Sequence, residues 1–108
     1  MPYSVSRLTP TQVQKLLCTI PQWNFIAGGN HHSKLDTIRR EYRFRSFEES
    51  WSFITRVAMR AHKLGHHPTI VNKYNIVELE LTTHDVEGLS ELDFKMAKAL
   101  EKAALQLE

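Results

Sequence analysis

Apolar residues recur at helical spacing in three segments of the chain, and each segment begins with a capping signal. The first begins at Thr9, where Pro10 suits the first helical position and Gln12 completes a capping box. The last begins at Ser90, with Asp93 at the same spacing. The apolar stripes are Val13, Leu16, Leu17 and Ile20 in the first segment, and Leu92, Met96, Leu100, Ala103 and Leu107 in the last. Each stripe predicts an amphipathic helix with one buried side.

The middle segment has the clearest beginning and end. Ser46 and Glu49 have capping-box spacing. One apolar row then contains Trp51, Ile54, Ala58 and Ala61, and a second contains Phe53, Val57 and Leu64. Gly65 favours the left-handed conformation that ends helices, and Pro68 disfavours helix at the residue before it. We therefore expect the second helix to end just before the histidine pair that precedes Pro68.

Between these helices, apolar and polar residues alternate with the two-residue period of β-strands. We expect one strand over residues 23–27, ending at a Gly-Gly-Asn turn signal, and a second over residues 38–45. A further hairpin pairs residues 69–72 with residues 76–82. Its second strand turns Val77, Leu79 and Leu81 inward and Glu78 and Glu80 outward.

The resulting order, α-β-β-α-β-β-α, predicts an α+β fold: a four-stranded antiparallel sheet with three helices packed on one face. We expect residues 1–108 to form a single domain, because 108 residues suit one hydrophobic core. An exposed edge strand or the wetter sheet face could pair with a second subunit, which protects an open edge.

Composition excludes several classes of protein. No apolar run is long enough to span a membrane, and the first ten residues lack the core of a secretory signal, so we expect a cytoplasmic protein. At 12.6 kDa it could also enter the nucleus without a targeting signal. The single cysteine, Cys18, excludes an internal disulfide, and its helical position predicts buried packing. A net charge of +2 does not by itself indicate nucleic-acid binding.

Three histidines form the main candidate for chemistry. His66 and His67 precede the first strand of the second hairpin, and His84 follows its last strand, so strand pairing brings all three to one end of the sheet. Imidazole gains and loses protons near neutral pH and therefore serves as a general acid or base without a cofactor. Each well-placed group is worth about 10² to 10⁴ in rate.

Other interpretations compete with acid/base chemistry. Three imidazoles could hold zinc with one open position, but His66 and His67 are adjacent, and adjacent side chains diverge on a strand, so we expect no metal. The histidines could instead only cap a helix end and fill a turn. His31 and His32 lie in a polar loop, and we interpret them as solvated.

Nucleic-acid binding is a weaker hypothesis. It would use Arg39, Arg40, Arg43 and Arg45. These arginines are expected on an edge strand, where basic side chains more often deter aggregation.

The residues around the histidines resemble a known family. His66-His67-Pro68, five residues, Tyr74, nine residues, His84, eight residues and Asp93 resemble the signature of the pterin-4a-carbinolamine dehydratases. The stretches SFEESWSFITRVAMRAHKLGHHP and YNIVELELTTHDVEGLSELD are also similar to that family. The resemblance covers roughly residues 7–105. The fold of the family matches the order of elements predicted above.

The resemblance implies a lyase that removes water from 4a-hydroxytetrahydropterin to give quinonoid dihydropterin, in tetrahydrobiopterin recycling. One group protonates the departing hydroxyl and another takes a proton from the adjacent ring nitrogen. By analogy, the catalytic residues are His66, His67 and His84. His66 and His84 form the acid/base pair, and His67 positions the substrate and could share in proton transfer. Backbone groups around Pro68 and from Thr83 to Asp85 would hold the polar edge of the pterin.

The resemblance further implies that no cofactor is needed and that the protein is a homo-oligomer. It also supplies an alternative function, because mammalian members bind a homeodomain transcription factor and stabilise its dimer, and some relatives act in assembly. Such a role would use a helical surface and not the histidines.

The sequence departs from the family pattern near the site. Four residues before the histidine pair, the family often has a carboxylate, whereas this chain has His62. Where an aromatic residue commonly follows the proline, this chain has Thr69 and Ile70, so stacking on the pterin ring is expected to be weaker. We expect Asp93 to act mainly as a helix cap and Tyr74 as a turn residue.

Overall fold

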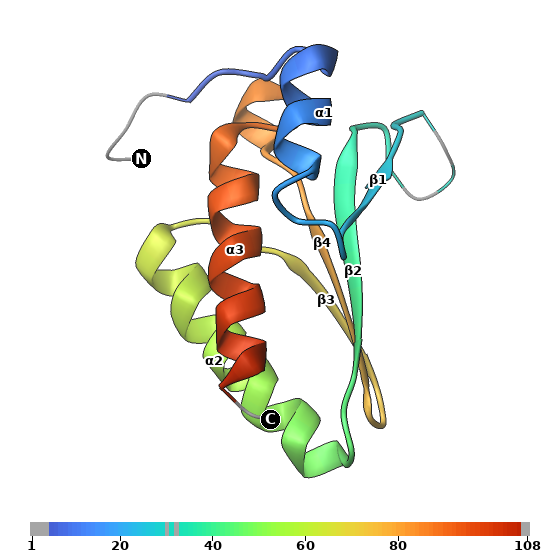
Figure 1. Cartoon of the computed structure of the whole chain (residues 1–108), viewed down its shortest axis with the longest axis vertical. Helices are drawn as coiled ribbons and strands as arrows, with labels where there is room; N and C mark the ends of the chain where they lie inside the picture. The colour runs from blue at the N-terminus through green and yellow to red at the C-terminus, as the bar shows by residue number, and fades with distance from the viewer. Residues whose placement is uncertain (1–4, 30, 32, 107–108) are drawn as a thin grey trace.

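The structure is a computed structural model that describes residues 5–29, 31 and 33–106. The predicted order of elements is confirmed, with one short 3₁₀ helix added before the last helix (Figure 1). The helices are α1 (Pro10–Leu17), α2 (Phe47–Leu64) and α3 (Glu91–Leu105), and the 3₁₀ turn is η1 (His84–Val86). The strands are β1 (Asn24–Ile26), β2 (Thr37–Arg43), β3 (Thr69–Lys73) and β4 (Ile76–Leu81).

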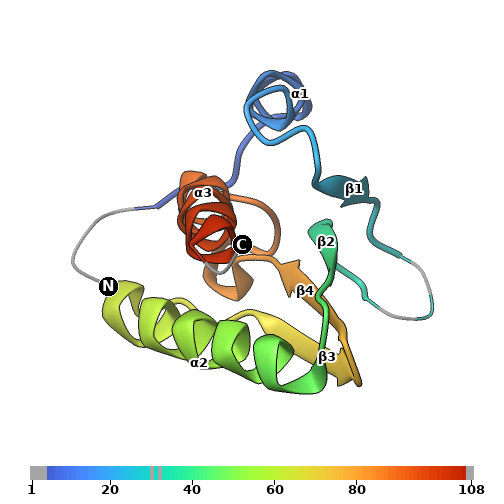
Figure 2. The same cartoon turned by 60° about the horizontal axis from the view of Figure 1, so that its bottom comes forward.

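The four strands form one antiparallel sheet in the order β1-β2-β4-β3. The helices lie on one side of it, with α2 and α3 side by side and α1 beyond α3, toward β1 (Figure 2). Strand β2 is therefore central, and the expectation that its arginines lie on an edge strand is wrong. The edges are the short β1 and the exposed β3.

Register decides which side chains enter the core. Val77, Leu79 and Leu81 of β4 are fully buried, as their alternation predicts. Directly paired residues share a face in an antiparallel sheet, so Tyr42, which pairs with Val77, also points toward the helices. Phe53 of α2 packs against the Tyr42 ring with centroids 4.7 Å apart. The sheet and the helices therefore enclose one apolar core.

The predicted caps form, with one difference. Both capping boxes, Thr9 with Gln12 and Ser90 with Asp93, are complete. At the start of α2, the Ser46 hydroxyl accepts a hydrogen bond from the Glu49 backbone N–H, but the Glu49 carboxylate accepts from Arg45 in place of the cap. An arginine one residue before the cap therefore takes the carboxylate that would have closed the box.

Three local expectations are wrong. Trp51 is 48% exposed and Ala58 is also exposed, because the side of α2 that packs carries Phe53, Ile54, Val57 and Ala61. Cys18 is exposed, since α1 ends at Leu17 and the cysteine falls outside its buried side. The second strand ends at Arg43, two residues early. Leu107 lies outside the described residues.

Glu101 of α3 joins the helical layer to the sheet. Its Oε1 accepts hydrogen bonds from Trp23 Nε1 at 3.0 Å, Arg40 Nε at 2.7 Å and Tyr42 OH at 2.7 Å. The Arg40 guanidinium also stacks over the Tyr42 ring, 4.0 Å from its centroid. Burial and the neighbouring carboxylate raise the pKa of the Tyr42 hydroxyl above its usual range. No helix among the described residues is long and apolar enough to cross a membrane.

Candidate functional site

The end of α2 places the histidine pair. Gly65 adopts the left-handed conformation, with φ of 64°, and its N–H and that of His66 bond back to the last turn of the helix. The chain then leaves the helix and enters β3 at Thr69, as Pro68 predicts. His66 is buried by this turn, with 8% exposure, whereas His67 is exposed.

A buried carboxylate holds His66. Nε2 of the imidazole lies 2.6 Å from Asp93 Oδ1, and Asp93 is completely buried at the first turn of α3. The other oxygen, Oδ2, accepts from the Thr83 hydroxyl at 2.8 Å and from the Ser90 backbone N–H at 3.0 Å. Three donors therefore replace the water that a buried carboxylate loses. An ionised carboxylate only accepts, so with that form of Asp93 the Nε2 atom of His66 is the donor and Nδ1 is left for other partners.

The same network fixes the chain beside His84. Thr83 is buried, and its hydroxyl also lies 2.8 Å from the Ser90 hydroxyl. Its backbone bonds to Gly88 in both directions, so the loop between them closes into the turn η1. His84 and Asp85 lie on this turn and are exposed. The buried Thr83 thus anchors an exposed histidine next to it in the chain.

The N-terminal segment supports this loop from outside. The Leu8 N–H bonds to the Leu89 carbonyl at 2.8 Å. The side chain of Arg7 lies so close to Gly88 that a Cβ there would be 2.7 Å from Arg7 Cδ. Any residue other than glycine at position 88 would therefore require the Arg7 side chain to move.

The structure therefore connects the sequence-predicted site residues through Asp93. His66 and Thr83 bond to the same carboxylate, and His67 and His84 are their neighbours in the chain. Pro68, half-buried, follows the histidine pair. Pairing of Thr69 with Glu80 sets the end of the hairpin at which these residues lie.

Asp93 is the site residue whose role the sequence interpretation missed. Its spacing after Ser90 predicted a capping function, which is confirmed. The side chain has a second carboxylate oxygen, and tertiary packing brings His66 to it across 27 residues. Its place in the dehydratase signature was the signal for this second role.

Other candidate chemistry finds less support. Among residues 5–29, 31 and 33–106, no group of three or more potential ligands could hold a metal ion. His31 is exposed, and His32 lies outside the described residues. Tyr74 occupies the β3–β4 turn with φ of 52° and is 64% exposed, as its predicted turn role requires.

Three of the four arginines in residues 39–45 are engaged with carboxylates. Arg39 contacts Glu78 and Glu80 at 2.9 Å each, which raises the pKa of its guanidinium. Arg40 bonds to Glu101. Arg45 pairs with Glu49 at 2.8 Å, and hydrogen bonds from Arg45 lower the pKa of that carboxyl. Three of the four arginines proposed to bind nucleic acid are thus neutralised within the chain.

A helix-covered antiparallel sheet, with a carboxylate-bound histidine where a hairpin meets two helices, defines a class of small α+β protein with a candidate acid/base site. A family model described as pterin 4 alpha carbinolamine dehydratase matches residues 6–103. The chain belongs to that family.

Sequence identity to individual proteins supports the same family membership. The chain is 43% identical over 98 residues to a Novosphingobium aromaticivorans protein named "Putative pterin-4-alpha-carbinolamine dehydratase", covering 91% of this chain and 96% of the relative. A protein of the same name from Rhizobium johnstonii is 41% identical over 100 residues, covering 93% of each chain.

Solved structures share the fold. A transcriptional coactivator/pterin dehydratase from Brucella melitensis superposes with a TM-score of 0.81 at 33% identity, over 92% of this chain and 99% of that one. A pterin dehydratase-like RuBisCO assembly factor of the α-carboxysome superposes with a TM-score of 0.61 at 18% identity, over 77% of this chain and 89% of that one. The second likeness shows the fold alone.

Proposed function

We propose that this protein is a cofactor-free dehydratase that removes water from a 4a-hydroxytetrahydropterin, as a step of tetrahydrobiopterin recycling. The observation that carries the proposal is the buried His66–Asp93 pair, joined through Thr83 to the turn that begins at His84. A histidine that only filled a helix end would not need a fully buried carboxylate. Membership of the dehydratase family supports the same function.

The reaction requires two proton transfers. The hydroxyl on the pterin leaves as water after it gains a proton, and the adjacent ring nitrogen loses one, so that a carbon–nitrogen double bond forms. In our proposal His66 and His84 carry out these transfers, and His67 orients the substrate. Because Nε2 of His66 is bound to Asp93, its Nδ1 is the atom proposed to exchange a proton. Backbone groups around Pro68 and from Thr83 to Asp85 are proposed to bind the pterin edge.

The test is a dehydration assay that follows loss of 4a-hydroxytetrahydropterin by absorbance. His66→Ala and His84→Ala are each expected to lower kcat by about 10² to 10⁴. His31→Ala, at an exposed loop histidine, is the matched control and should keep wild-type activity. Losses of tenfold or less in both site variants, with the fold intact by circular dichroism, would contradict the proposal.

A second candidate function is an interaction role, which is supported by the similarity to the Brucella melitensis protein described as a transcriptional coactivator/pterin dehydratase. In that case a wild-type chain without dehydratase activity would still bind a protein partner, and His66→Ala would leave the binding unchanged. The two functions are separable, because the histidines and the outer helical surfaces do not overlap.

We also propose that the protein is a cytoplasmic homo-oligomer that can enter the nucleus. Strand β3 supports self-association, because it is a sheet edge whose Ile70 and Val71 are 38% and 51% exposed. An apolar edge strand left open invites pairing with another chain.

A further inference from the structure

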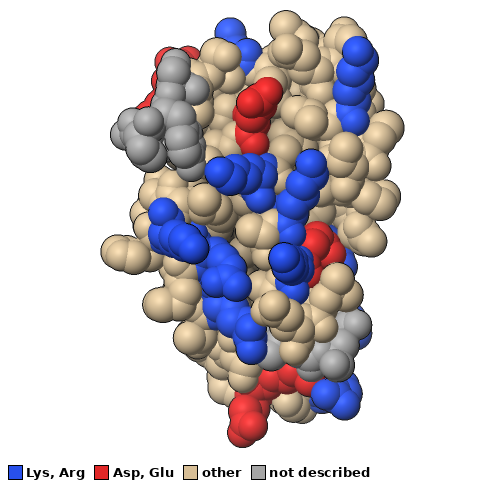
Figure 3. All heavy atoms as spheres, turned by 60° about the vertical axis from the view of Figure 1, so that its left-hand side comes forward, with Lys and Arg blue, Asp and Glu red and all other residues tan. Residues whose placement is uncertain are grey.

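Cationic side chains gather on the outer surface of the two long helices. They form two rows, with Arg56, Arg60 and Lys63 on α2 and Lys95, Lys98 and Lys102 on α3. Within each row the spacing is three or four residues, which places the members on one side of a helix. Figure 3 shows Lys and Arg collected in a band on this side of the molecule. We call these six residues the basic face.

Two contacts align the rows. His66, just past the end of α2, bonds to Asp93 in the first turn of α3, and Arg56 Nη1 bonds to Gln106 Oε1 at 2.9 Å. The helices are therefore antiparallel. With this register, position 63 is level with position 98 and position 60 with position 102 along the two helices.

Most of the positive charge of the basic face is not paired with carboxylates. Within the part of the chain that the structure describes, Arg60, Lys63, Lys98 and Lys102 take part in no ion pair. Glu101 lies on the same helix but is bonded to Arg40, Trp23 and Tyr42 on the side of the sheet. Glu91, four residues before Lys95, is exposed and places one carboxylate at the pocket end of the α3 row. Like charges side by side repel, and a partner that supplied carboxylates would relieve this repulsion.

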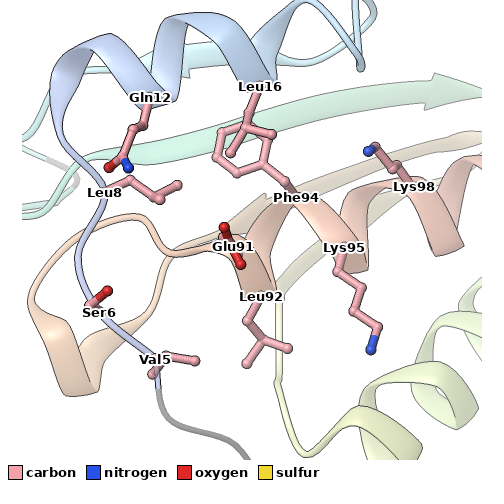
Figure 4. A pocket seen from close by; sticks show the side chains of 10 residues that line it. All are labelled: Val5, Ser6, Leu8, Gln12, Leu16, Glu91, Leu92, Phe94, Lys95 and Lys98. Carbon is pink, nitrogen blue, oxygen red and sulfur yellow. The ribbon is translucent and has the colours of Figure 1, made fainter.

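A pocket lies at one end of the basic face. It has a volume of about 610 Å³ and lies between the N-terminal segment, α1 and the start of α3. Its apolar lining is Val5, Leu8, Leu16, Leu92 and Phe94. Lys95 and Lys98 belong to both the pocket and the basic face, and Figure 4 shows them following Phe94 along α3. A charged surface thus continues into an apolar recess.

We propose that the basic face and this pocket bind an acidic helical segment of a partner protein, with an apolar side chain of that segment seated in the pocket. An acidic helix presents carboxylates every three to four residues, which matches the spacing of the two rows. The apolar side chain of the partner would fill the pocket. A buried apolar contact surrounded by charged contacts is typical of peptide recognition.

Nucleic acid fits these observations less well. Binding of single strands uses aromatic rings on which bases stack, and the six residues of the basic face include none. An apolar pocket has no role against a phosphate backbone, and the net charge of the chain is only +2. The surface uses none of the site histidines, so the inference is independent of the proposed dehydratase activity.

The test measures fluorescence anisotropy of a labelled helical 20-residue peptide with Glu at every third or fourth position and one Phe near its end. Wild-type protein is expected to bind this probe at least tenfold more tightly than it binds the same peptide with Ala in place of Phe. Raising the salt from about 50 to 300 mM should weaken binding at least tenfold.

The variant Lys95→Glu/Lys98→Glu/Lys102→Glu is expected to lose binding by tenfold or more. The control Lys34→Glu/Arg43→Glu/Lys73→Glu makes the same change in net charge at exposed residues elsewhere and should bind as wild type. Dehydratase activity and the circular dichroism spectrum should be unchanged in both variants.

Three results would overturn the inference. Equal weakening by the two triple variants would show that only net charge matters. No difference between the Phe and Ala peptides would remove the pocket from the interaction. Tighter binding to a 20-base-pair DNA duplex than to the peptide would assign the surface to nucleic acid instead.

Discussion

His66 Nε2 and Asp93 Oδ1 lie 2.6 Å apart, and the carboxylate that makes this contact also completes the N-terminal cap of α3. One buried side chain therefore fixes both where a helix begins and how an imidazole is oriented. The capping oxygen and the imidazole-binding oxygen are different atoms of the same group, so the two roles can be tested separately.

Asp93→Asn is expected to lower dehydratase kcat by roughly 10- to 100-fold, because it replaces the charged acceptor of His66 with an amide. Ser90→Ala removes the capping hydroxyl and should cost about 1 kcal/mol of unfolding free energy while changing kcat only a few-fold. Steady-state kinetics and urea unfolding of both variants provide the measurement. Equal kinetic losses in the two variants would mean that Asp93 acts only through the cap.

Gly65→Ala is expected to destabilise the protein by about 1 kcal/mol, because alanine resists the left-handed conformation at φ of 64°. An added Cβ would meet nothing within 4 Å, so the cost comes from the backbone alone. Since Gly65 directs the chain into His66, activity should fall as well. Gly29→Ala, at φ of 82° in an open loop, should cost similar stability and leave activity intact.

Glu101→Ala is expected to lower the unfolding free energy by about 2 to 4 kcal/mol. The variant removes the acceptor of three hydrogen bonds, one of them from a charged guanidinium. Lys102→Ala, at the next and exposed position, should change stability by less than about 0.5 kcal/mol. Thermal and urea unfolding compare the two, and similar values for both variants would show that the Glu101 contacts contribute little.

Stability should fall at alkaline pH through Tyr42. Its folded-state pKa is raised, mainly by burial, so above pH 10 the unfolded chain loses this proton while the folded chain keeps it. The stabilisation is complete below the unfolded pKa of about 10 and declines above it, by up to about 1.4 kcal/mol per pH unit. Urea unfolding between pH 9 and 11 should show a steeper decline for wild type than for Tyr42→Phe. Parallel curves would contradict this assignment.

Self-association through β3 predicts that light scattering will give a mass above 12.6 kDa for wild type. Val71→Lys should shift the protein toward monomer, because a charged side chain on an edge strand opposes pairing. Leu105→Lys, at a 63% exposed residue of α3, is the control and should leave the mass unchanged. A monomeric wild type at high concentration would remove the self-association proposal.

Local patterns in the sequence were sufficient for the elements of the fold and for the place of each site histidine at the end of an element. Capping residues, Gly65 and Pro68 act within a few positions of themselves, and strand alternation with a short turn fixes which residues pair. The order of helices and strands, the inward row of β4 and the position of His84 after it all follow from such short-range rules.

Tertiary structure alone decided how distant segments meet. The sequence does not encode locally that β2 is central, that Arg40 reaches Glu101, or that Trp51 faces outward while Phe53 is buried. Nor does it show that a capping aspartate also binds an imidazole 27 positions away. These outcomes depend on how helices pack over a sheet, because burial, ion pairing and shared acceptors are set by distance in space and not by separation along the chain.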